Sequence, residues 1–456
     1  MDKKIINQVI NIVGPENVLT DNEERICYSY DGTFKRGIPD IVVFPGNTQE
    51  VVSIIKLANS EKIPVFPRGA GTGLSGGSIP QANGIALVMT KMNKIKEINE
   101  NDLLAVVEPG VITGHLHQEV EKLNLFYPPD PASLKTCTMG GNIAENAGGP
   151  RAFKYGVTRD YVLGLEVVTP TGKVMRTGGR TVKNVTGYDL TRLLTGSEGT
   201  LGVITEITVR LIPKPKYKKT ALVIFDNLDD AAKTVTVVIS EGVIPATLEL
   251  MDRITIACVE KNTKLGLPLD AEAILLMEVD GSDAQTTEEI NIIQNICKKN
   301  NCRRIEVAST FEEREKLWKA RRAVSSAIVQ LKPTKISEDA TVPRSKIPEM
   351  IRRLREIATK YNLNLPVFGH AGDGNLHPNI IADKSDKEEM ERVEKAVSEI
   401  FEAALELGGT LSGEHGVGIM KKPYLEWELG EVGLEYLKTI KKAVDPNNIL
   451  NPGKIF

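Results

Sequence analysis

Apolar positions recur with helical spacing in some segments of the chain and with strand spacing in others. The order of the predicted helices and strands changes near residue 214. The first fourteen residues, "MDKKIINQVINIVG", have apolar positions at helical spacing and predict an amphipathic first helix. A strand, a helix and a second strand are expected over residues 40–67, where one helical face is apolar. In residues 206–211 polar and apolar positions alternate, as in a half-buried strand. Residues 40–211 therefore predict one sheet-rich domain.

The second half of the chain has a different order of elements. Between residues 214 and 308 the pattern predicts strand, helix and strand twice in succession, an order typical of a ferredoxin-like sandwich. The segment "KPKYKK", residues 214–219, is the expected linker before it. Farther on, a capping box of Ser385 and Glu388 is expected to begin a helix that stops at Gly408.

Composition and charge exclude several classes of protein. The 456 residues are 41% hydrophobic and 26% charged, close to the average of globular proteins. With 57 basic and 60 acidic residues the net charge is -3, so the chain has no basic field for nucleic acid. No apolar run is long enough for a transmembrane segment, and no signal peptide is recognised. Five cysteines without a C-x-x-C pair argue against a disulfide framework or an iron–sulfur cluster, so we expect a cytoplasmic protein.

The first glycine-rich run, "PRGAGTGLSGG" at residues 67–77, contains the letters of the dinucleotide fingerprint G-x-G-x-x-G. A Rossmann site needs a helix directly after these glycines. Here Gly77, Pro80 and Gly84 would break such a helix. Two interpretations remain for this run alone: a loop whose N–H groups surround a pyrophosphate, or a glycine-rich surface loop.

Two further runs favour the pyrophosphate loop. Residues 128–156 contain paired glycines, small residues and asparagines, which suit a backbone that wraps an extended polar ligand. Residues 196–205, "GSEGTLGVIT", join a loop to the strand that closes the domain. In this order the three runs resemble the flavin-binding domain of the vanillyl-alcohol oxidase/PCMH superfamily. Within it they are most similar to the FAD-dependent D-2-hydroxyacid dehydrogenases, which include D-lactate dehydrogenases and the glycolate oxidase flavin subunit.

The resemblance covers nearly the whole chain and implies an α+β fold. It implies an N-terminal helix and a PCMH-type FAD-binding domain of two α/β subdomains at residues 1–213, a substrate or cap domain with a ferredoxin-like sheet at 214–410, and a C-terminal helical segment at 411–456 that returns to the FAD domain. Covalently flavinylated relatives carry a histidine where this chain has Thr72, so noncovalent FAD is implied. The residues implied at the FAD are Pro67, Arg68, Gly69, Ala70, Gly71, Thr72, Gly73, Ser75, Gly76, Pro129, Asp130, Met139, Gly140, Gly141, Asn142, Ala144, Asn146, Gly149, Gly156, Glu198, Gly202, Val203 and Asn451.

Three of the five histidines lie in two other glycine-rich stretches, "FGHAGDGNLHPN" and "GGTLSGEHGVG". The glycines allow His370 and His377 to approach each other, and Glu414 adds a carboxylate, a ligand set that suits Zn, Mn or Fe. The spacing alone supports a metal only modestly. In the resembling family the residues that match His370, His377 and Glu414 are the metal ligands, and the match of His415 is the general base.

A 2-hydroxyacid needs a cation for its carboxylate, and residues 318–335 offer several. A guanidinium binds a carboxylate through two hydrogen bonds, so from the residues alone either Arg321 or Arg322 is the candidate. By resemblance, Arg321 and Lys335 match the carboxylate contacts of the family, and Ser325, one turn after Arg321, adds a hydrogen bond.

The resemblance implies an enzyme that oxidises a D-2-hydroxyacid, with D-lactate or glycolate favoured, by hydride transfer to FAD. The electrons are expected to pass to a separate acceptor, such as an electron-transfer flavoprotein, an iron–sulfur subunit, a cytochrome or a quinone. One alternative is a transferase like alkyl-dihydroxyacetonephosphate synthase, which shares the architecture. Another is an electron-transfer subunit that is active only with a partner.

Overall fold

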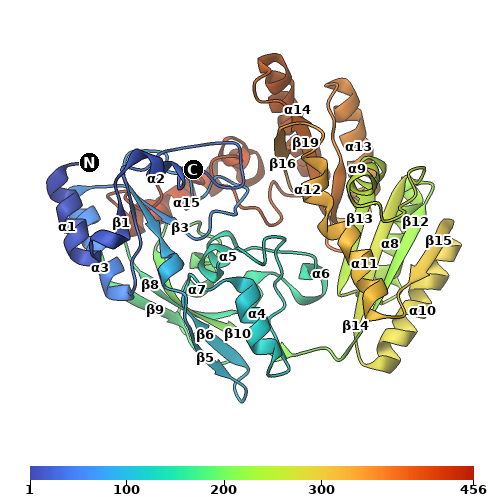
Figure 1. Cartoon of the computed structure of the whole chain (residues 1–456), viewed down its shortest axis with the longest axis horizontal. Coiled ribbons are helices and arrows are strands. Elements are labelled where there is room, and N and C mark those ends of the chain that lie inside the picture. Colours follow the sequence, from blue (N-terminus) through green and yellow to red (C-terminus); the bar gives the residue numbers. More distant parts are fainter. The chain divides into compact units, whose positions relative to one another are not determined.

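The computed structural model describes all 456 residues, which form two compact units (Figure 1). Unit 1 comprises residues 1–148, 157–214 and 414–456, and unit 2 comprises residues 149–156 and 215–413. The chain therefore passes from one unit to the other four times. The short segment 149–156, which the sequence assigns to the first domain, belongs to unit 2.

The N-terminal part of unit 1 is a four-stranded sheet in the order β1-β2-β4-β3. The predicted strand, helix and strand are β2 (Ile41–Val43), α3 (Thr48–Glu61) and β3 (Val65–Arg68), and β4 (Ile85–Val88) pairs in parallel with both strands. The predicted first helix is α1 (Lys3–Val13), which Asp2 caps by accepting the N–H of Lys4 at 2.9 Å. The apolar faces of α1 and α3 pack into one core with these strands.

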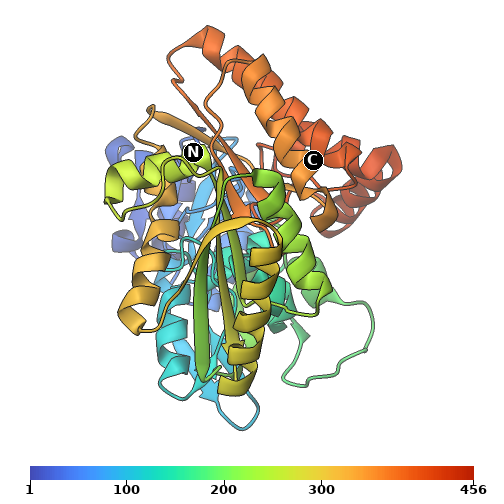
Figure 2. The same cartoon turned by 90° about the vertical axis from the view of Figure 1, so that its right-hand side faces the viewer.

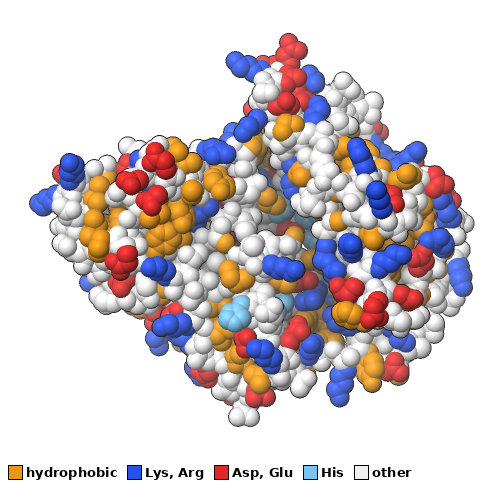
Figure 3. Space-filling view, viewed as in Figure 1, with side chains coloured by type: hydrophobic (Ala, Val, Ile, Leu, Met, Phe, Trp, Pro, Cys, Tyr) orange, Lys and Arg blue, Asp and Glu red, His pale blue; other side chains and the backbone are white.

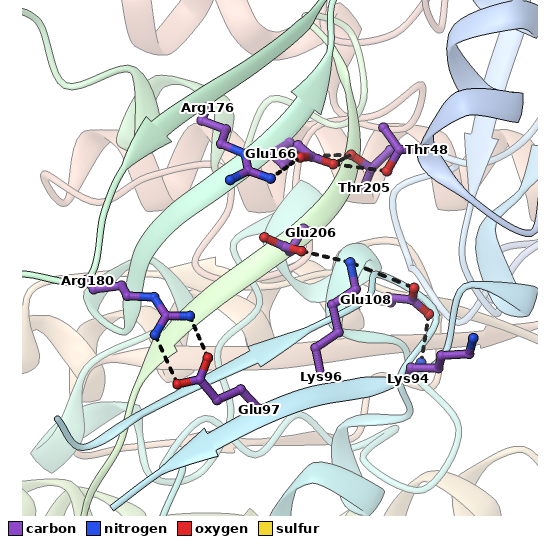
Figure 4. A network of polar contacts seen from close by, with 10 residues as sticks. All are labelled: Thr48, Lys94, Lys96, Glu97, Glu108, Glu166, Arg176, Arg180, Thr205 and Glu206. Atoms are coloured by element: carbon purple, nitrogen blue, oxygen red, sulfur yellow. Dashed lines mark hydrogen bonds and ion pairs between the residues drawn. The ribbon is translucent and has the colours of Figure 1, made fainter. Parts of the chain in front are cut away.

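The second part of unit 1 is a five-stranded antiparallel sheet in the order β5-β6-β10-β8-β9. The alternation predicted for residues 206–211 is present in β10, where buried and half-buried residues alternate. Polar contacts join strands of this sheet (Figure 4): Arg176 of β9 pairs with Glu166 of the neighbouring β8, and Lys96 of β5 pairs with Glu206 of β10. The strands are β5 (Ile95–Asn99), β6 (Leu104–Val107), β8 (Val162–Val168), β9 (Val174–Gly178) and β10 (Val203–Arg210).

The C-terminal segment of unit 1 begins with a long helix, α15 (Leu425–Val444), which is interrupted at Gly430. Beyond it the chain lies beside β3, since Val65 donates its N–H to the Ile449 carbonyl and accepts the N–H of Asn451. The remaining elements of unit 1 are β1 (Val18–Leu19), α2 (Asn22–Ile26), α4 (Thr113–Glu121), β7 (Leu125–Phe126), α5 (Met139–Glu145), α7 (Leu190–Leu194) and β11 (Ile212–Pro213).

Unit 2 is built on an eight-stranded sheet with the order β15-β12-β14-β13-β18-β19-β16, and β17 pairs with β19. Counted in chain order, its first four strands lie in the spatial order 4-1-3-2 with antiparallel pairs, which confirms the predicted ferredoxin-like sandwich. Helices α8 and α10 lie over one face of these strands (Figure 2). The strands are β12 (Tyr217–Phe225), β13 (Thr247–Asp252), β14 (Ala273–Gly281), β15 (Cys302–Val307), β16 (Thr334–Ser337), β17 (Ala340–Thr341), β18 (Val367–His370) and β19 (Asn375–Ala382).

The opposite face of this sheet packs against α9, α11 and α12 in a second apolar core. The helix predicted near residue 385 is α14, but the predicted capping box is wrong. Asp386 caps it by accepting the N–H of Glu389 at 3.0 Å, while the Ser385 hydroxyl donates to Asp383. The helices of unit 2 are α6 (Ala152–Tyr155), α8 (Leu228–Ser240), α9 (Arg253–Thr263), α10 (Asp283–Lys299), α11 (Phe311–Arg322), α12 (Val324–Ile328), α13 (Ile347–Lys360) and α14 (Lys387–Glu406).

The surface carries charges of both signs. Figure 3 shows basic and acidic side chains interspersed over the visible face, in agreement with the nearly balanced composition. None of the helices combines the length and the apolar composition needed to span a bilayer. All five cysteines are free thiols.

Candidate active site

A cavity of about 230 Å³ in unit 1 is lined by residues of all three glycine-rich runs. The first run follows β3 and leads to β4 without a helix, so it provides no helix N-terminus of the Rossmann kind. The second run surrounds α5, and the third follows α7. The residues expected at the cofactor that line this cavity are Pro67, Arg68, Gly69, Ala70, Gly71, Thr72, Gly73, Gly140, Gly141, Asn142, Ala144, Glu198, Gly202 and Val203.

Two glycines of the first run allow the backbone to approach its neighbours closely. Gly71 has a φ of +70°, and a Cβ there would lie 2.0 Å from the Arg68 guanidinium. A Cβ at Gly69 would lie 2.2 Å from Oγ1 of Thr138, the hydroxyl that caps α5. The wall of the cavity is therefore backbone with no room for larger side chains, which suits a ligand bound by main-chain N–H groups.

Two carboxyl groups, those of Glu145 and Glu198, also line the cavity. Burial raises the pKa of Glu198, although the N–H groups of Val417 and Gly418 donate to it at 2.7 and 2.8 Å and oppose the rise. Burial, followed by the charge of Glu198, raises the pKa of Glu145 well above its usual range. These shifts favour protonation, so the cavity presents less negative charge to a ligand that carries phosphates.

Several residues expected at the cofactor do not line this cavity. Asn451 instead ties two loops together, because its amide donates to the carbonyls of Gly77 at 2.9 Å and Glu198 at 2.6 Å. The Pro129 carbonyl lies 3.0 Å from Nε2 of the buried His117. The others outside the lining are Ser75, Gly76, Asp130, Met139 and Asn146, together with Gly149 and Gly156, which belong to unit 2.

Glu414 and His415, the expected metal ligand and general base, line the same cavity of unit 1. They begin the last segment of this unit. A Cβ at Gly148 would lie 2.6 Å from a carboxylate oxygen of Glu414, so this carboxylate contacts the backbone of the second glycine-rich run. A carboxylate and an imidazole thus lie beside the glycine-lined wall.

In unit 2, four adjacent strands place polar side chains on one face of the sheet. Glu249 of β13 pairs in register with His370 of β18, and Phe368 of β18 pairs with His377 of β19. On β16, Lys335 pairs with Ile381 of β19. Because side chains alternate along a strand and paired residues share a face, all of them point to the side that α9, α11 and α12 cover.

The two histidines are brought together by the turn between β18 and β19. Gly374 has a φ of +84°, and a Cβ there would lie 2.0 Å from the Val342 carbonyl oxygen, so only glycine fits this turn. The ring centroids of His370 and His377 lie 5.0 Å apart with the ring planes nearly perpendicular. Both residues are buried.

Glu249 lies on the same face, on β13, and was not singled out in the sequence. It is fully buried, it accepts a hydrogen bond from Arg321 Nε at 2.6 Å, and its other oxygen lies 2.6 Å from His370 Nδ1. Burial acts to raise the pKa of Glu249, but Arg321 and His370 outweigh it and hold the pKa below its usual range. The buried carboxylate is therefore ionised and balanced by its two partners.

The two arginines that the sequence offered for the substrate carboxylate differ in their surroundings. Arg321 is mostly buried, and its guanidinium lies over the Phe368 ring at 4.8 Å. Arg322 is exposed and pairs with Glu315 at 2.8 Å. Lys335 donates to Ser325 Oγ at 3.0 Å, and burial lowers the pKa of its ammonium group. Arg321 therefore belongs to the polar face, and Arg322 does not.

Comparison with known proteins identifies the family. Residues 214–455 match the family described as FAD linked oxidases, C-terminal domain, and residues 39–178 match the FAD binding domain. The chain is 51% identical over 455 residues to Glycolate oxidase subunit GlcD of Bacillus subtilis (strain 168), with 100% of this chain and 97% of that protein covered. It is 37% identical over 456 residues to D-lactate dehydrogenase of Anaerostipes hadrus, with 97% and 95% covered. The solved structure of p-cresol methylhydroxylase with substrate bound aligns with a TM-score of 0.83 at 21% identity, over 99% of this chain and 96% of that chain, and supports the fold alone.

The chain belongs to the FAD-linked oxidase family, as the order of its glycine-rich runs predicts. It is a FAD-dependent oxidoreductase that acts on hydroxyacids. Most of the cavity in unit 1 is lined by residues within the matched range 39–178. Its backbone walls, which a Cβ would fill at Gly69 and Gly71, fit the pyrophosphate of FAD.

Proposed function

We propose that this protein oxidises a D-2-hydroxyacid, D-lactate or glycolate, to the 2-oxoacid and passes the electrons through FAD to a separate protein acceptor. The observation that carries the proposal is the face of unit 2 that presents Arg321 and Lys335 together with two histidines. A 2-hydroxyacid has two groups that match these side chains. Its carboxylate can bind the two cationic side chains, and its hydroxyl can lie beside the two imidazoles. The relatives named as a glycolate oxidase subunit and as a D-lactate dehydrogenase support this class of substrate, and the second name supports the D configuration.

The substrate carboxylate is bound by Arg321 and Lys335. The planar guanidinium of Arg321 offers two parallel donors, and its packing over the Phe368 ring restricts its orientation. Burial lowers the pKa of Lys335, so a bound carboxylate also favours the charged form of this lysine. Ser325, which accepts a hydrogen bond from Lys335, orients the ammonium group and donates to the substrate.

The hydroxyl end of the substrate is handled by His370, His377, Glu414 and His415. We propose the first three as ligands of a divalent ion, because two imidazoles and one carboxylate suit such an ion. When bound, FAD supplies the two-electron acceptor, and a Zn, Mn or Fe ion supplies a Lewis acid that lowers the pKa of the hydroxyl. Neutral His415 takes the hydroxyl proton as general base. FAD is held noncovalently, since Thr72 offers no imidazole at the position used for tethering.

The electron acceptor is a second protein, such as an electron-transfer flavoprotein or an iron–sulfur subunit. The word "subunit" in the name of the Bacillus subtilis relative supports a partner of this kind. A flavin-dependent transferase has less support, because both relatives are named as oxidoreductases.

Anaerobic spectroscopy tests the proposal without an acceptor. The FAD-loaded protein is mixed in turn with D-lactate, L-lactate, glycolate and D-2-hydroxyglutarate while the flavin absorbance is followed. We expect D-lactate or glycolate to bleach the flavin and L-lactate to leave it oxidised. If none of the four acids bleaches it after divalent metal is restored, the dehydrogenase proposal is rejected in favour of the transferase or of a subunit that is active only with a partner.

A further inference from the structure

We propose that Glu249 is a positioning residue that holds the metal ligand His370 and the carboxylate clamp Arg321 in one coupled arrangement. The inference rests on the proposed function, because that function assigns the metal to His370 and the substrate carboxylate to Arg321. Glu249 itself is not proposed to touch substrate or flavin. Its two oxygens each serve one of the two functional side chains.

On this face each of five side chains contacts the next, and the last contacts the first. Glu249 contacts Arg321 at 2.6 Å and His370 at 2.6 Å. His370 lies against His377 with ring centroids 5.0 Å apart, and His377 lies 5.4 Å from Phe368. The Phe368 ring in turn carries the Arg321 guanidinium at 4.8 Å. A displacement of any member is therefore transmitted to both the imidazole pair and the guanidinium.

The geometry at His370 has a specific chemical consequence. An ionised carboxylate accepts only, so the ring nitrogen that faces Glu249, Nδ1, carries the hydrogen. The other nitrogen, Nε2, then presents its lone pair, which is the form that binds a metal ion. A carboxylate behind a metal-bound imidazole also fixes the ring orientation, and its loss weakens metal binding by about 10–100-fold.

The isosteric variant Glu249→Gln separates this role from simple packing. A glutamine amide has one acceptor oxygen and one NH₂ group, so it can accept from Arg321 or from His370 but not from both. The NH₂ group then faces the remaining N–H donor. The side-chain volume is unchanged, and the buried charge and one acceptor are lost.

Glu278 provides a matched control on the same face of the sheet. It lies on β14, which pairs with β13, and it is almost fully buried. Like Glu249 it anchors a side chain of α11, because Trp318 Nε1 donates to it at 2.8 Å, and Thr220 donates to it at the same distance. None of its hydrogen-bond or ion-pair partners is a metal ligand or substrate-binding residue of the proposed site.

The test measures two affinities that need no turnover. FAD-loaded protein stripped of metal is titrated with Zn²⁺ against a chromophoric chelator, and the reloaded protein is titrated with pyruvate by calorimetry. For Glu249→Gln we expect Zn²⁺ affinity to fall about 10–100-fold and pyruvate affinity to fall about tenfold or more. Glu278→Gln is expected to keep both within about twofold of the wild type, since charge loss alone does not reach the site.

Other outcomes overturn the inference. Unchanged Zn²⁺ affinity in Glu249→Gln, an equal loss in Glu278→Gln, or a wild type that binds no Zn²⁺ would each do so. If Glu249→Gln does not fold, Arg321→Met tests the same coupling with Glu249 intact. We expect this variant to bind Zn²⁺ several-fold more tightly, because Glu249 then serves His370 alone, and unchanged affinity contradicts the coupling. Failure of the proposed function is distinguishable, because it appears as an unbleached flavin in wild-type protein whose Zn²⁺ affinity still depends on Glu249.

Discussion

The cavity of unit 1 and the polar face of unit 2 are two sites built by different means. The cavity is walled by the backbone of glycine-rich loops in which the functional residues are neighbours in sequence, as in residues 67–73. The polar face is made of side chains from separate strands and from α11, and Glu249 and His370 are 121 residues apart along the chain. The cavity of unit 1 requires positions without a side chain, so an added side chain damages it. The polar face of unit 2 requires specific side chains and their hydrogen-bond partners, so the loss of a side chain damages it. The two sites therefore differ in which substitutions damage them.

The largest effect is expected from His415, the one imidazole that lines the cavity of unit 1. Removing a general base lowers the rate by ~10²–10⁴-fold. His415→Ala should therefore retain FAD, because the glycine loops are intact, and reduce it slowly with saturating D-lactate or glycolate in anaerobic stopped flow. His115→Ala is the control, because His115 is exposed and pairs only with Glu119. Near-normal reduction in His415→Ala removes this residue from the mechanism.

Arg321→Met should act on substrate binding in the polar face and leave the cavity unaffected. A charge-assisted hydrogen bond contributes ~1.5–3 kcal/mol, so we expect KM to rise by about 10–150-fold while FAD content stays the same. The neighbouring Arg322→Met removes the same charge from an exposed position that pairs with Glu315, and KM should stay near the wild-type value. Equal effects of the two variants would show that the position of the charge does not matter.

Gly69→Ala should have the opposite selectivity to Arg321→Met. The added methyl group should damage the cavity of unit 1 and leave the polar face of unit 2 unaffected. A Cβ at Gly69 would lie 2.2 Å from Thr138 Oγ1, so the first two glycine-rich runs must separate. Overpacking of this kind costs ~1–3 kcal/mol, and we expect FAD affinity to fall about tenfold while Zn²⁺ affinity is retained. Gly179→Ala, with nothing within 4 Å of its Cβ, should bind FAD normally. Normal FAD affinity in Gly69→Ala would mean that the loops adapt.

Strand β13 carries two buried carboxyl groups, Glu249 and Asp252, whose pKa values shift in opposite directions. Burial raises the pKa of Asp252 to about 6, whereas the partners of Glu249 lower its pKa. Between about pH 4 and 6 the folded state binds more protons than the unfolded state at this group, so stability falls as the pH rises through that range. Asn retains the cap of α9 without the charge. Asp252→Asn should therefore raise the free energy of unfolding by about 1–3 kcal/mol at pH 7.5 and by almost nothing at pH 4, as measured by denaturant titration. A gain of equal size at both pH values would contradict the assigned titration.

The fold was largely predictable because its signals are local. Strand alternation in residues 206–211, the helical face of α3 and the strand and helix order of residues 214–308 all gave elements that the structure contains. Helix termini were less predictable, since Asp386 and Ser385 are both good caps and only the local backbone decides between them. The assignment of residues 149–156 to unit 2 depends on buried long-range contacts, such as the pair of Lys154 with Asp280 at 2.6 Å, which leave no local pattern.

In the candidate site, too, features with a local sequence signal were predictable and features that depend on long-range contacts were not. Glycine spacing located most of the cavity lining, because small residues in series have few other uses. Glu249 was missed, because "TLELM" reads as an ordinary strand and its role appears only once β13 lies beside β18. A glutamate inside an otherwise apolar strand was the available signal, since buried carboxylates are rare without partners.

Whether the side chains of unit 2 act in the reaction that reduces the flavin can be measured by removing and restoring the metal. The FAD-loaded protein is treated with a chelator, its flavin spectrum is checked to be unchanged, and D-lactate or glycolate is added without oxygen before and after a divalent ion is restored. We predict that the flavin remains yellow until the ion is restored and then bleaches. Equal bleaching before and after restoration would contradict it, because His370 and His377 would then have no metal-dependent part in the reaction.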